Sequence, residues 1–222
     1  MARLLVAFVV CISGAAFAQV APTVAETAAY KGLLIAAARG DAAEIARLAA
    51  GGASLNVRDG YGRTPLHVAT FGRQREAIAA LAKAGADIDA KERDRYDAVT
   101  IAAVANDVPT LKLLLELGAS AKQVTSRYDG TALIAAAHLG HADVVKLLIG
   151  AGAPLDHVNN LGWTALIEAI VLGDGGRRHT ETLRALVRAG ANVNVADRNG
   201  ATPLQLARSR GYKEMVAALE NR

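Results

Sequence analysis

The stretch Thr64-Pro65-Leu66-His67-Val68-Ala69 decides the fold of this chain. A threonine in front of a helix accepts a hydrogen bond from one of the first free backbone amides. A proline in the first helical position costs nothing, because the amide hydrogen it lacks would have no partner inside the helix. The stretch therefore predicts the start of a short helix, and its small Ala69 lets a neighbouring helix approach closely.

The same pattern returns along the chain. An alanine in the register of Ala69 follows a short apolar motif at six places, separated by 33, 33, 34, 33 and 38 residues. These places are Ala36, Ala69, Ala102, Ala136, Ala169 and Ala207. A Gly-Ala pair closes five of the six units, at Gly52-Ala53, Gly85-Ala86, Gly118-Ala119, Gly152-Ala153 and Gly190-Ala191. One such unit cannot bury its apolar faces alone, but a stack of units can.

This motif, with its period near 33, resembles the ankyrin repeat over residues 24–222. The resemblance implies an all-α repeat solenoid of six stacked units, each a helix-turn-helix with a β-hairpin finger. The expected units cover residues 24–59, 60–92, 93–126, 127–159, 160–197 and 198–222. Ankyrin arrays are known as protein-binding scaffolds, so the resemblance implies a binding module rather than an enzyme.

The ends of the expected helices are marked by suitable residues. The capping place of Thr64 is held by Asp97, Thr131, Thr164 and Thr202 in later units. Residues suited to left-handed backbone end the first helix at Gly40, Asn106, Gly140, Gly173 and Gly211, while Arg73 stands in this slot in the second unit. The first unit opens with Thr23-Val24-Ala25-Glu26, the pattern of a capping box. The last unit carries polar residues among its apolar positions, so we expect both end units to be caps.

The first eighteen residues have the pattern of a secretory signal. One positive charge precedes the apolar run Leu4 to Ile12, and Ala16-Phe17-Ala18 has the small residues of a cleavage site. The run is too short to span a bilayer, which takes about 20 residues. We expect cleavage after Ala18, a short N-terminal segment at 19–23, and a mature protein that is periplasmic or secreted. A buried N-terminal helix and a lipoprotein processed at Cys11 are the alternatives.

The composition excludes several other classes of protein. Apolar residues make up 52% and charged residues 21% of the chain, which excludes a disordered protein. The single cysteine lies in the expected signal, so the sequence predicts neither a disulfide framework nor a thiolate zinc cluster. The net charge of +4 is too small for a typical nucleic-acid-binding domain. No stretch beyond the signal is long and apolar enough to be a membrane anchor.

The tips of the expected fingers carry the residue types of binding hot spots. Four aromatic residues lie near the tips, at Tyr61, Tyr96, Tyr128 and Trp163. Arginines are interleaved with them, at Arg58, Arg63, Arg93, Arg95, Arg127 and Arg198. Equivalent positions of a stack form a ladder along one edge, so we predict that this tip ladder is the main partner-binding surface. In the alternative, the rings pack against adjacent hairpins and the arginines are only solvated.

The fifth unit contains an insertion. Its interval of 38 residues is about five longer than the others, and the extra residues fall in Gly173-Asp174-Gly175-Gly176-Arg177-Arg178-His179. The glycines and the two arginines, Arg177 and Arg178, indicate a loop between helices that clamps an anionic group or a carboxylate of a partner. The alternative is a surface loop without a role, because lengthening a loop costs little free energy.

No constellation of residues indicates catalysis, a metal or a cofactor. His138 and His141 are three residues apart, but Gly140 ends the helix between them. His138 and Glu168 belong to the first helices of neighbouring units, and we expect them to face the same concavity as a polar pocket. Gly173–Gly176 lacks the lysine of a phosphate-binding loop, and the spacing supports no Ser-His-Asp arrangement. We therefore expect no enzyme.

One further resemblance bears on the partner. The run Leu161 to Ala169, followed by Gly173–Gly176, resembles small secreted proteobacterial ankyrin proteins. Some of those relatives are thought to assist haem catalases and peroxide defence, which implies a haem catalase or another periplasmic protein as the partner. We expect a monomeric array that binds through its finger tips and its concave helix face. The alternatives are a stabilising or chaperone-like structural protein, and a binder of haem or a small ligand at His138 or His179.

Overall fold

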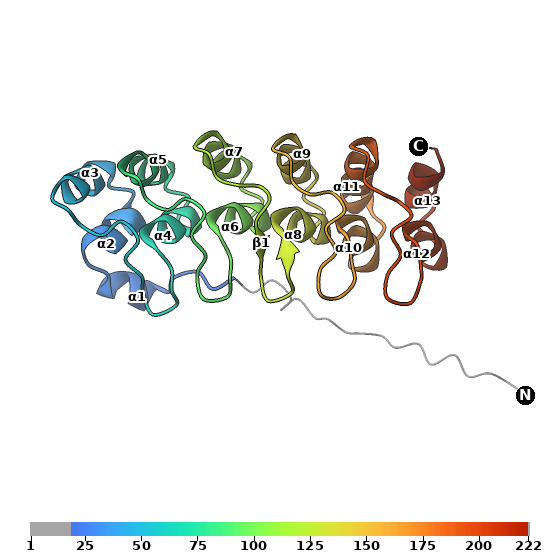
Figure 1. Ribbon diagram of the computed structural model, residues 1–222, viewed down its shortest axis with the longest axis horizontal. Coiled ribbons are helices and arrows are strands. Elements are labelled where there is room, and N and C mark those ends of the chain that lie inside the picture. The colour runs from blue at the N-terminus through green and yellow to red at the C-terminus, as the bar shows by residue number, and fades with distance from the viewer. Residues whose placement is uncertain (1–18, 222) are drawn as a thin grey trace, which may run out of the picture.

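Thirteen helices and one short sheet make up residues 19–221, the part of the chain that this computed structural model describes. Twelve of the helices form six pairs that stack side by side in two rows (Figure 1). The inner row holds α2 (Gly32–Arg39), α4 (Pro65–Phe71), α6 (Ala98–Val104), α8 (Ala132–His138), α10 (Ala165–Val171) and α12 (Pro203–Ser209). The outer row holds α3 (Ala42–Ala50), α5 (Arg75–Ala84), α7 (Val108–Glu116), α9 (Ala142–Gly150), α11 (Arg177–Arg188) and α13 (Lys213–Glu220). The predicted all-α solenoid of six units is confirmed.

The core is aliphatic and rich in alanine. The register alanines lie inside it, and Ala69, Ala136, Ala169 and Ala207 are each 0% exposed. Because each of these side chains is one methyl group, the inner helices of neighbouring units pack closely against one another. The longer apolar residues of the outer helices, such as Ile78, Leu111 and Leu148, fill the space between the two rows. Stacking therefore buries faces that a single unit would leave in water.

The predicted caps are present at the helix starts. The Thr64 hydroxyl accepts from the backbone amide of His67, whose ring nitrogen Nδ1 lies 3.1 Å from the Thr64 amide and completes the cap. The Asp97 carboxylate accepts from the Thr100 amide at 2.7 Å. The same bond is made at the starts of α8, α10 and α12 by Thr131, Thr164 and Thr202. These side chains satisfy amides that the helix itself leaves free.

The turns after the inner helices confirm the prediction except in the fifth unit. Gly40, Asn106, Gly140 and Gly211 all have positive φ, and Arg73 takes the same conformation at a φ of 54°. The prediction for Gly173 was wrong, because the insertion moves the left-handed residue to Gly175, at a φ of 71°. Gly173 is constrained in another way: a Cβ there would lie 2.1 Å from the carbonyl oxygen of Ala169.

The first unit contains an extra helix. The predicted capping box at Thr23 and Glu26 is present, with the Thr23 amide donating to the Glu26 carboxylate at 2.8 Å. The helix that it opens, α1 (Val24–Ala29), is short and ends before α2 begins at Gly32, which has a φ of 54°. In Figure 1, α1 lies below α2, on the side to which the fingers point. The predicted signal at residues 1–18, with Cys11, lies outside the described residues.

The fingers are mostly tight turns. Within residues 19–221, paired strands occur in one finger, where β1 (Val124–Thr125) and β2 (Gly130–Thr131) run antiparallel. In the second finger, which leads from the first unit into the second, the Asp59 carboxylate accepts from the amides of Tyr61 and Arg63, at 2.8 and 2.9 Å. Asn159 holds the turn of the fifth finger, which leads from the fourth unit into the fifth, in the same way. A side-chain acceptor of this kind fixes a turn without a strand ladder, so the expectation of a hairpin in every unit was too regular.

The insertion mainly extends a helix. α11 begins at Arg177 and contains 12 residues, compared with nine in α9. Arg177, Arg178 and His179 therefore lie in the first turn of α11, which corrects the prediction that they belong to a loop. Across residues 19–221, none of the helices combines the length and the apolar character needed to cross a membrane.

Candidate partner-binding surface

The four tip aromatics occupy two different positions of the repeat. Tyr61 and Tyr128 stand three residues before a helix cap, whereas Tyr96 and Trp163 stand directly before one. The two kinds of position alternate along the stack. The rings therefore do not form the single ladder that the sequence analysis predicted.

Tyr61 is the most exposed of these rings, at 37%. Two guanidinium groups flank it: the Cζ atoms of Arg63 and Arg93 lie 4.7 and 5.4 Å from the ring centroid. Cations at this distance are attracted by the electrons of the ring face. The ring is thus held in one orientation with much of its surface open, which suits a binding anchor.

Tyr96 differs from the expectation. It is only 4% exposed, and burial raises its pKa to about 12. Its carbonyl oxygen lies 3.1 Å from Nε2 of His67, which ties the second unit to the third. Burial also lowers the pKa of His67 to about 4, so the ring is neutral at physiological pH. Tyr128 and Trp163 are half-buried and keep part of their surface for contact.

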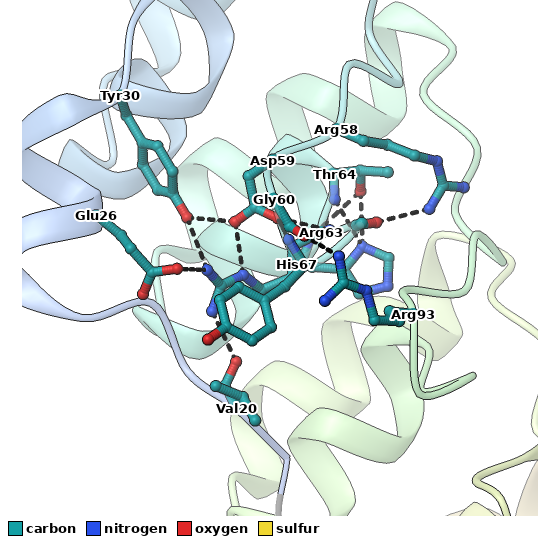
Figure 2. A network of polar contacts seen from close by, with 12 residues as sticks. Val20, Glu26, Tyr30, Arg58, Asp59, Gly60, Arg63, Thr64, His67 and Arg93 are labelled. Atoms are coloured by element: carbon teal, nitrogen blue, oxygen red, sulfur yellow. Dashed lines mark hydrogen bonds and ion pairs between the residues drawn. The ribbon is translucent and has the colours of Figure 1, made fainter.

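Arg63 is also buried, at 1% exposure, which removes it from the candidate surface. Figure 2 shows the polar network around it. Its guanidinium contacts Oδ2 of Asp59 at 2.6 Å and Oε1 of Glu26 at 2.7 Å. It also donates to the carbonyl oxygen of Val20 at 2.8 Å. Arg63 therefore fastens the N-terminal segment and α1 to the second finger.

The same network fixes the charge of Asp59. Burial alone would raise the pKa of this carboxyl, but hydrogen bonds from the Tyr30 hydroxyl and from Arg63 hold it below its ordinary value. The Tyr30 hydroxyl donates to Oδ2 of Asp59 at 2.6 Å, and its own pKa is raised by burial and by this bond. Asp59 thus remains ionised opposite a buried cation, as a buried charge requires.

Other tip arginines join neighbouring fingers. Arg93 donates to the carbonyl oxygen of Gly60, and Arg198 donates to that of Asn160. Arg58 donates to the carbonyl oxygen of Lys91 in the next unit at 2.7 Å. In these contacts, guanidinium groups donate hydrogen bonds that connect neighbouring fingers. The arginines therefore have a structural role in addition to any contact with a partner.

Two ion pairs cross between the third and fourth fingers. Arg95 lies 2.7 Å from the carboxylate of Asp129, and Arg127 lies 3.4 Å from that of Asp94. Arg95 and Asp129 are each about half exposed, at 48%. Exposed pairs of this kind add little stability. Together with the half-buried ring of Tyr128, they form a polar and aromatic patch that is open to a partner.

The insertion packs against both of its neighbours. His179 is buried, with Nδ1 at 2.9 Å from Asp174 and Nε2 at 3.0 Å from the carbonyl oxygen of His138. Arg177 pairs with Glu181 along α11, and Arg178 donates to the carbonyl oxygen of Leu139. Both arginines remain exposed at the surface. Their proposed contact with an anion or a partner stays a prediction.

The predicted contact of His138 with Glu168 is confirmed, but Glu168 is buried and does not face an open concavity as was expected. Nδ1 of His138 lies 3.1 Å from Oε2 of Glu168, which is 1% exposed. Sequence reasoning missed Asn159, whose amide donates to the other carboxylate oxygen at 2.9 Å. The signal for it was the place of Asn159 in the turn of its finger, which is the place of Asp59 in the second finger. Residues 19–221 contain no group of three or more side chains able to hold a metal ion.

The inner helices present an apolar face beside the tips. The place two residues after the register alanine is half-buried in the first five units, where it holds Ala38, Phe71, Val104, His138 and Val171. At the first two units this face is covered by the chain's own N-terminal segment. A small cavity of about 150 Å³ lies between them, lined by Ala21 and Pro22 on one side and by Val68 and Phe71 on the other.

Comparisons with known proteins agree with this architecture. The family model of ankyrin repeats (three copies) matches residues 20–92, 99–197 and 156–221. The putative ankyrin repeat protein YahD of Escherichia coli is 34% identical over 187 residues, which is 84% of this chain and 92% of that protein. The crystal structure of an ankyrin repeat domain from Acinetobacter baumannii superposes with a TM-score of 0.80 at 43% identity. That match covers 85% of this chain and 96% of that one.

A second solved structure, the ankyrin repeat protein EF0377, gives a TM-score of 0.78 at 31% identity and covers 86% of this chain and 98% of that one. Ankyrin repeat domains are generally protein-binding scaffolds and are typically non-enzymatic. The family model covers most of the chain, and the helix pairs, caps and turns follow its repeat. The chain therefore belongs to the ankyrin-repeat family.

Proposed function

We propose that this protein is an exported bacterial scaffold that binds one partner protein through its finger tips and the adjoining inner-helix face. The observation that carries the proposal is the exposed ring of Tyr61, held between Arg63 and Arg93. A ring that is already oriented loses little freedom on binding, so more of its contact energy appears as affinity. Aromatic and arginine residues together are the usual content of a binding hot spot.

The proposed surface extends from Tyr61 to the patch around Tyr128. Arg95 and Arg127 lie between the two rings, and Trp163 continues the surface in the fifth unit. Arg177 and Arg178 lie on another element and form a separate candidate contact. The proposal assigns no catalytic step and no cofactor.

The test is cross-linking in the bacterial envelope, followed by identification of the captured protein. The test variant carries Tyr61→Ala, Tyr128→Ala and Trp163→Ala. The matched control carries Lys112→Ala and Lys146→Ala, which change exposed residues of the outer helices. Circular dichroism establishes that all three proteins are folded before they are compared.

We expect one dominant partner that is captured by the wild type and the control and is lost from the test variant. A haem catalase in that place would connect the scaffold to peroxide defence. The same broad set of clients from all three proteins would contradict the proposal and favour the chaperone-like alternative. A variant with Arg177→Ala and Arg178→Ala then tests whether α11 takes part.

A further inference from the structure

The positive charge of the chain is concentrated toward its C-terminal end. Residues 173–222 contain nine lysines and arginines but only five aspartates and glutamates, whereas residues 19–172 contain 15 and 16. Two of these arginines, Arg184 and Arg188, lie four residues apart on α11. Like charges at this spacing are neighbours on the helix surface and destabilise the helix slightly. The stability of α11 therefore does not account for this pair of arginines.

The same two places carry no such pair in the two preceding outer helices. Counted back from the glycine of the Gly-Ala pair, Lys112 and Glu116 of α7 hold the places of Arg184 and Arg188. Their charges are opposite, and they form an ion pair at 3.8 Å. In α9 the second place holds Gly150, which has no side chain. The double arginine is thus a departure of the fifth unit from the repeat.

The two arginines border a groove between α11 and α13, which pack against each other at the C-terminal end of the stack (Figure 1). The volume of this α11–α13 groove is about 510 Å³. Its lining is Arg184, Arg188, Val187, Ala217, Ala218 and Asn221. The groove therefore combines two guanidinium groups with an apolar surface.

Both guanidinium groups have donors left for a ligand. Arg188 is exposed and forms no hydrogen bond or ion pair with any other residue between 19 and 221. Arg184 uses Nη2 to contact Oε2 of Glu214 at 2.6 Å, and the Glu214 side chain is 73% exposed. A guanidinium has five donor hydrogens, so this one contact leaves others free. Its planar fork matches the two oxygens of a carboxylate.

We propose that the α11–α13 groove binds an acidic segment of a partner protein, in which carboxylates flank an apolar side chain. The carboxylates pair with Arg184 and Arg188, and the apolar side chain packs on Val187 and Ala217. A concave site with both kinds of surface fits such a peptide better than a membrane, which is flat. The groove lies on the outer helices, away from the finger tips, so this inference depends neither on the proposed tip surface nor on export.

The test is a titration of the full chain with a short fluorescent peptide of alternating glutamate and leucine residues, followed by fluorescence anisotropy. The test variant carries Arg184→Gln and Arg188→Gln. The matched control carries Lys112→Gln and Lys146→Gln, which remove the same charge at the place of Arg184 in two other outer helices. Circular dichroism establishes that every variant is folded. We expect the peptide to bind the test variant about tenfold more weakly than the wild type. The control should change by less than about twofold.

A third variant should have the opposite effect. Glu214→Gln removes the carboxylate that competes for Arg184, so the acidic peptide should bind this variant more tightly than the wild type. A second peptide, with glutamine in place of glutamate, should bind all four proteins weakly. Added salt should weaken the binding of the acidic peptide, because it screens the charges.

Several results would overturn the proposal. An equal loss of affinity in the test variant and the control would show that the peptide responds to net charge and not to the groove. Equal binding of the two peptides by the wild type would remove the role of the arginines. No binding of the acidic peptide, together with binding to phosphatidylglycerol vesicles that the test variant loses, would assign the arginines to a membrane surface instead.

Discussion

Nδ1 of His138 on α8 lies 3.1 Å from Oε2 of Glu168 on α10, and this contact joins the inner helices of the fourth and fifth units. Oε1 of the same carboxylate accepts from Asn159, which in turn fixes the turn of the fifth finger. One buried carboxylate thus connects two units and one finger. Its removal tests how much the stack depends on polar contacts.

Glu168→Ala should destabilise the protein by about 2 kcal/mol, because the buried amide of Asn159 and the half-buried ring of His138 lose their acceptor at once. Glu168→Gln should cost less, since its amide oxygen can still accept from Asn159. Urea unfolding followed by circular dichroism measures both values. Equal losses in the two variants would show that side-chain volume, and not hydrogen bonding, decides the outcome.

Arg63→Met should destabilise the protein by about 3 kcal/mol, because it leaves the buried carboxylate of Asp59 without its cation. The N-terminal segment should also be released, since Val20 and Glu26 lose the same guanidinium. Hydrogen exchange of residues 20–30 measures the release, and urea unfolding measures the stability. Glu26→Gln is the control, and it should loosen α1 with a much smaller loss of stability.

The free energy of unfolding should fall as the pH decreases from about 6.5 to about 4, partly because of His67. Burial lowers the pKa of His67 to about 4 in the folded state. In this window the unfolded chain takes up a proton at His67 that the folded protein does not, so acid favours unfolding. The size of the effect is about 3 kcal/mol at most. Unfolding of His67→Gln over the same pH range should show a shallower dependence, and an unchanged dependence would contradict the assignment.

Arg73→Gly should stabilise the protein by about 1 kcal/mol. Arg73 holds a left-handed φ of 54°, which costs free energy for any residue with a Cβ. Its own ion pair with Asp107 is long, at 3.6 Å, and its side chain is 62% exposed, so little is lost with it. Arg73→Ala removes the same side chain but keeps the Cβ. Thermal unfolding should therefore rank glycine above alanine, and equal values would show that the backbone is not strained.

The fold could be predicted because the same alanine register occurs six times, and its physical meaning is the same each time. Each register alanine marks a close approach of helices, and each Thr or Asp marks a helix start. The helix start at Thr23 was predicted, but the break that separates α1 from α2 was not, since residues 19–31 carry no repeat motif to set them in register. The expectation of a β-hairpin in every finger was wrong, because a side-chain acceptor such as Asp59 can hold a turn without a strand ladder.

The candidate site was predicted less well, for two different reasons. The alternation of Tyr61 and Tyr128 with Tyr96 and Trp163 was readable from the distance of each ring to the next helix cap. The burial of Arg63 was not readable, because its partners come from the N-terminal segment. The pairing of His138 with Glu168 was predicted since both lie on the inner helices of adjacent units.

The insertion adds hydrogen bonds between the fifth unit and both of its neighbours, so the units are not equally strongly joined along the array. His179 of the fifth unit reaches back to the fourth, while the Tyr212 hydroxyl of the sixth unit donates to the carbonyl oxygen of Gly173 at 3.0 Å. A repeat array frays from its ends, where each unit has a single neighbour. Fraying that begins at α13 must therefore break the hydrogen bond between Tyr212 and Gly173, and then the one between His179 and His138, before it passes the fifth unit. On heating, the fourth and fifth units should be the last to melt, as a core from which refolding spreads toward both ends.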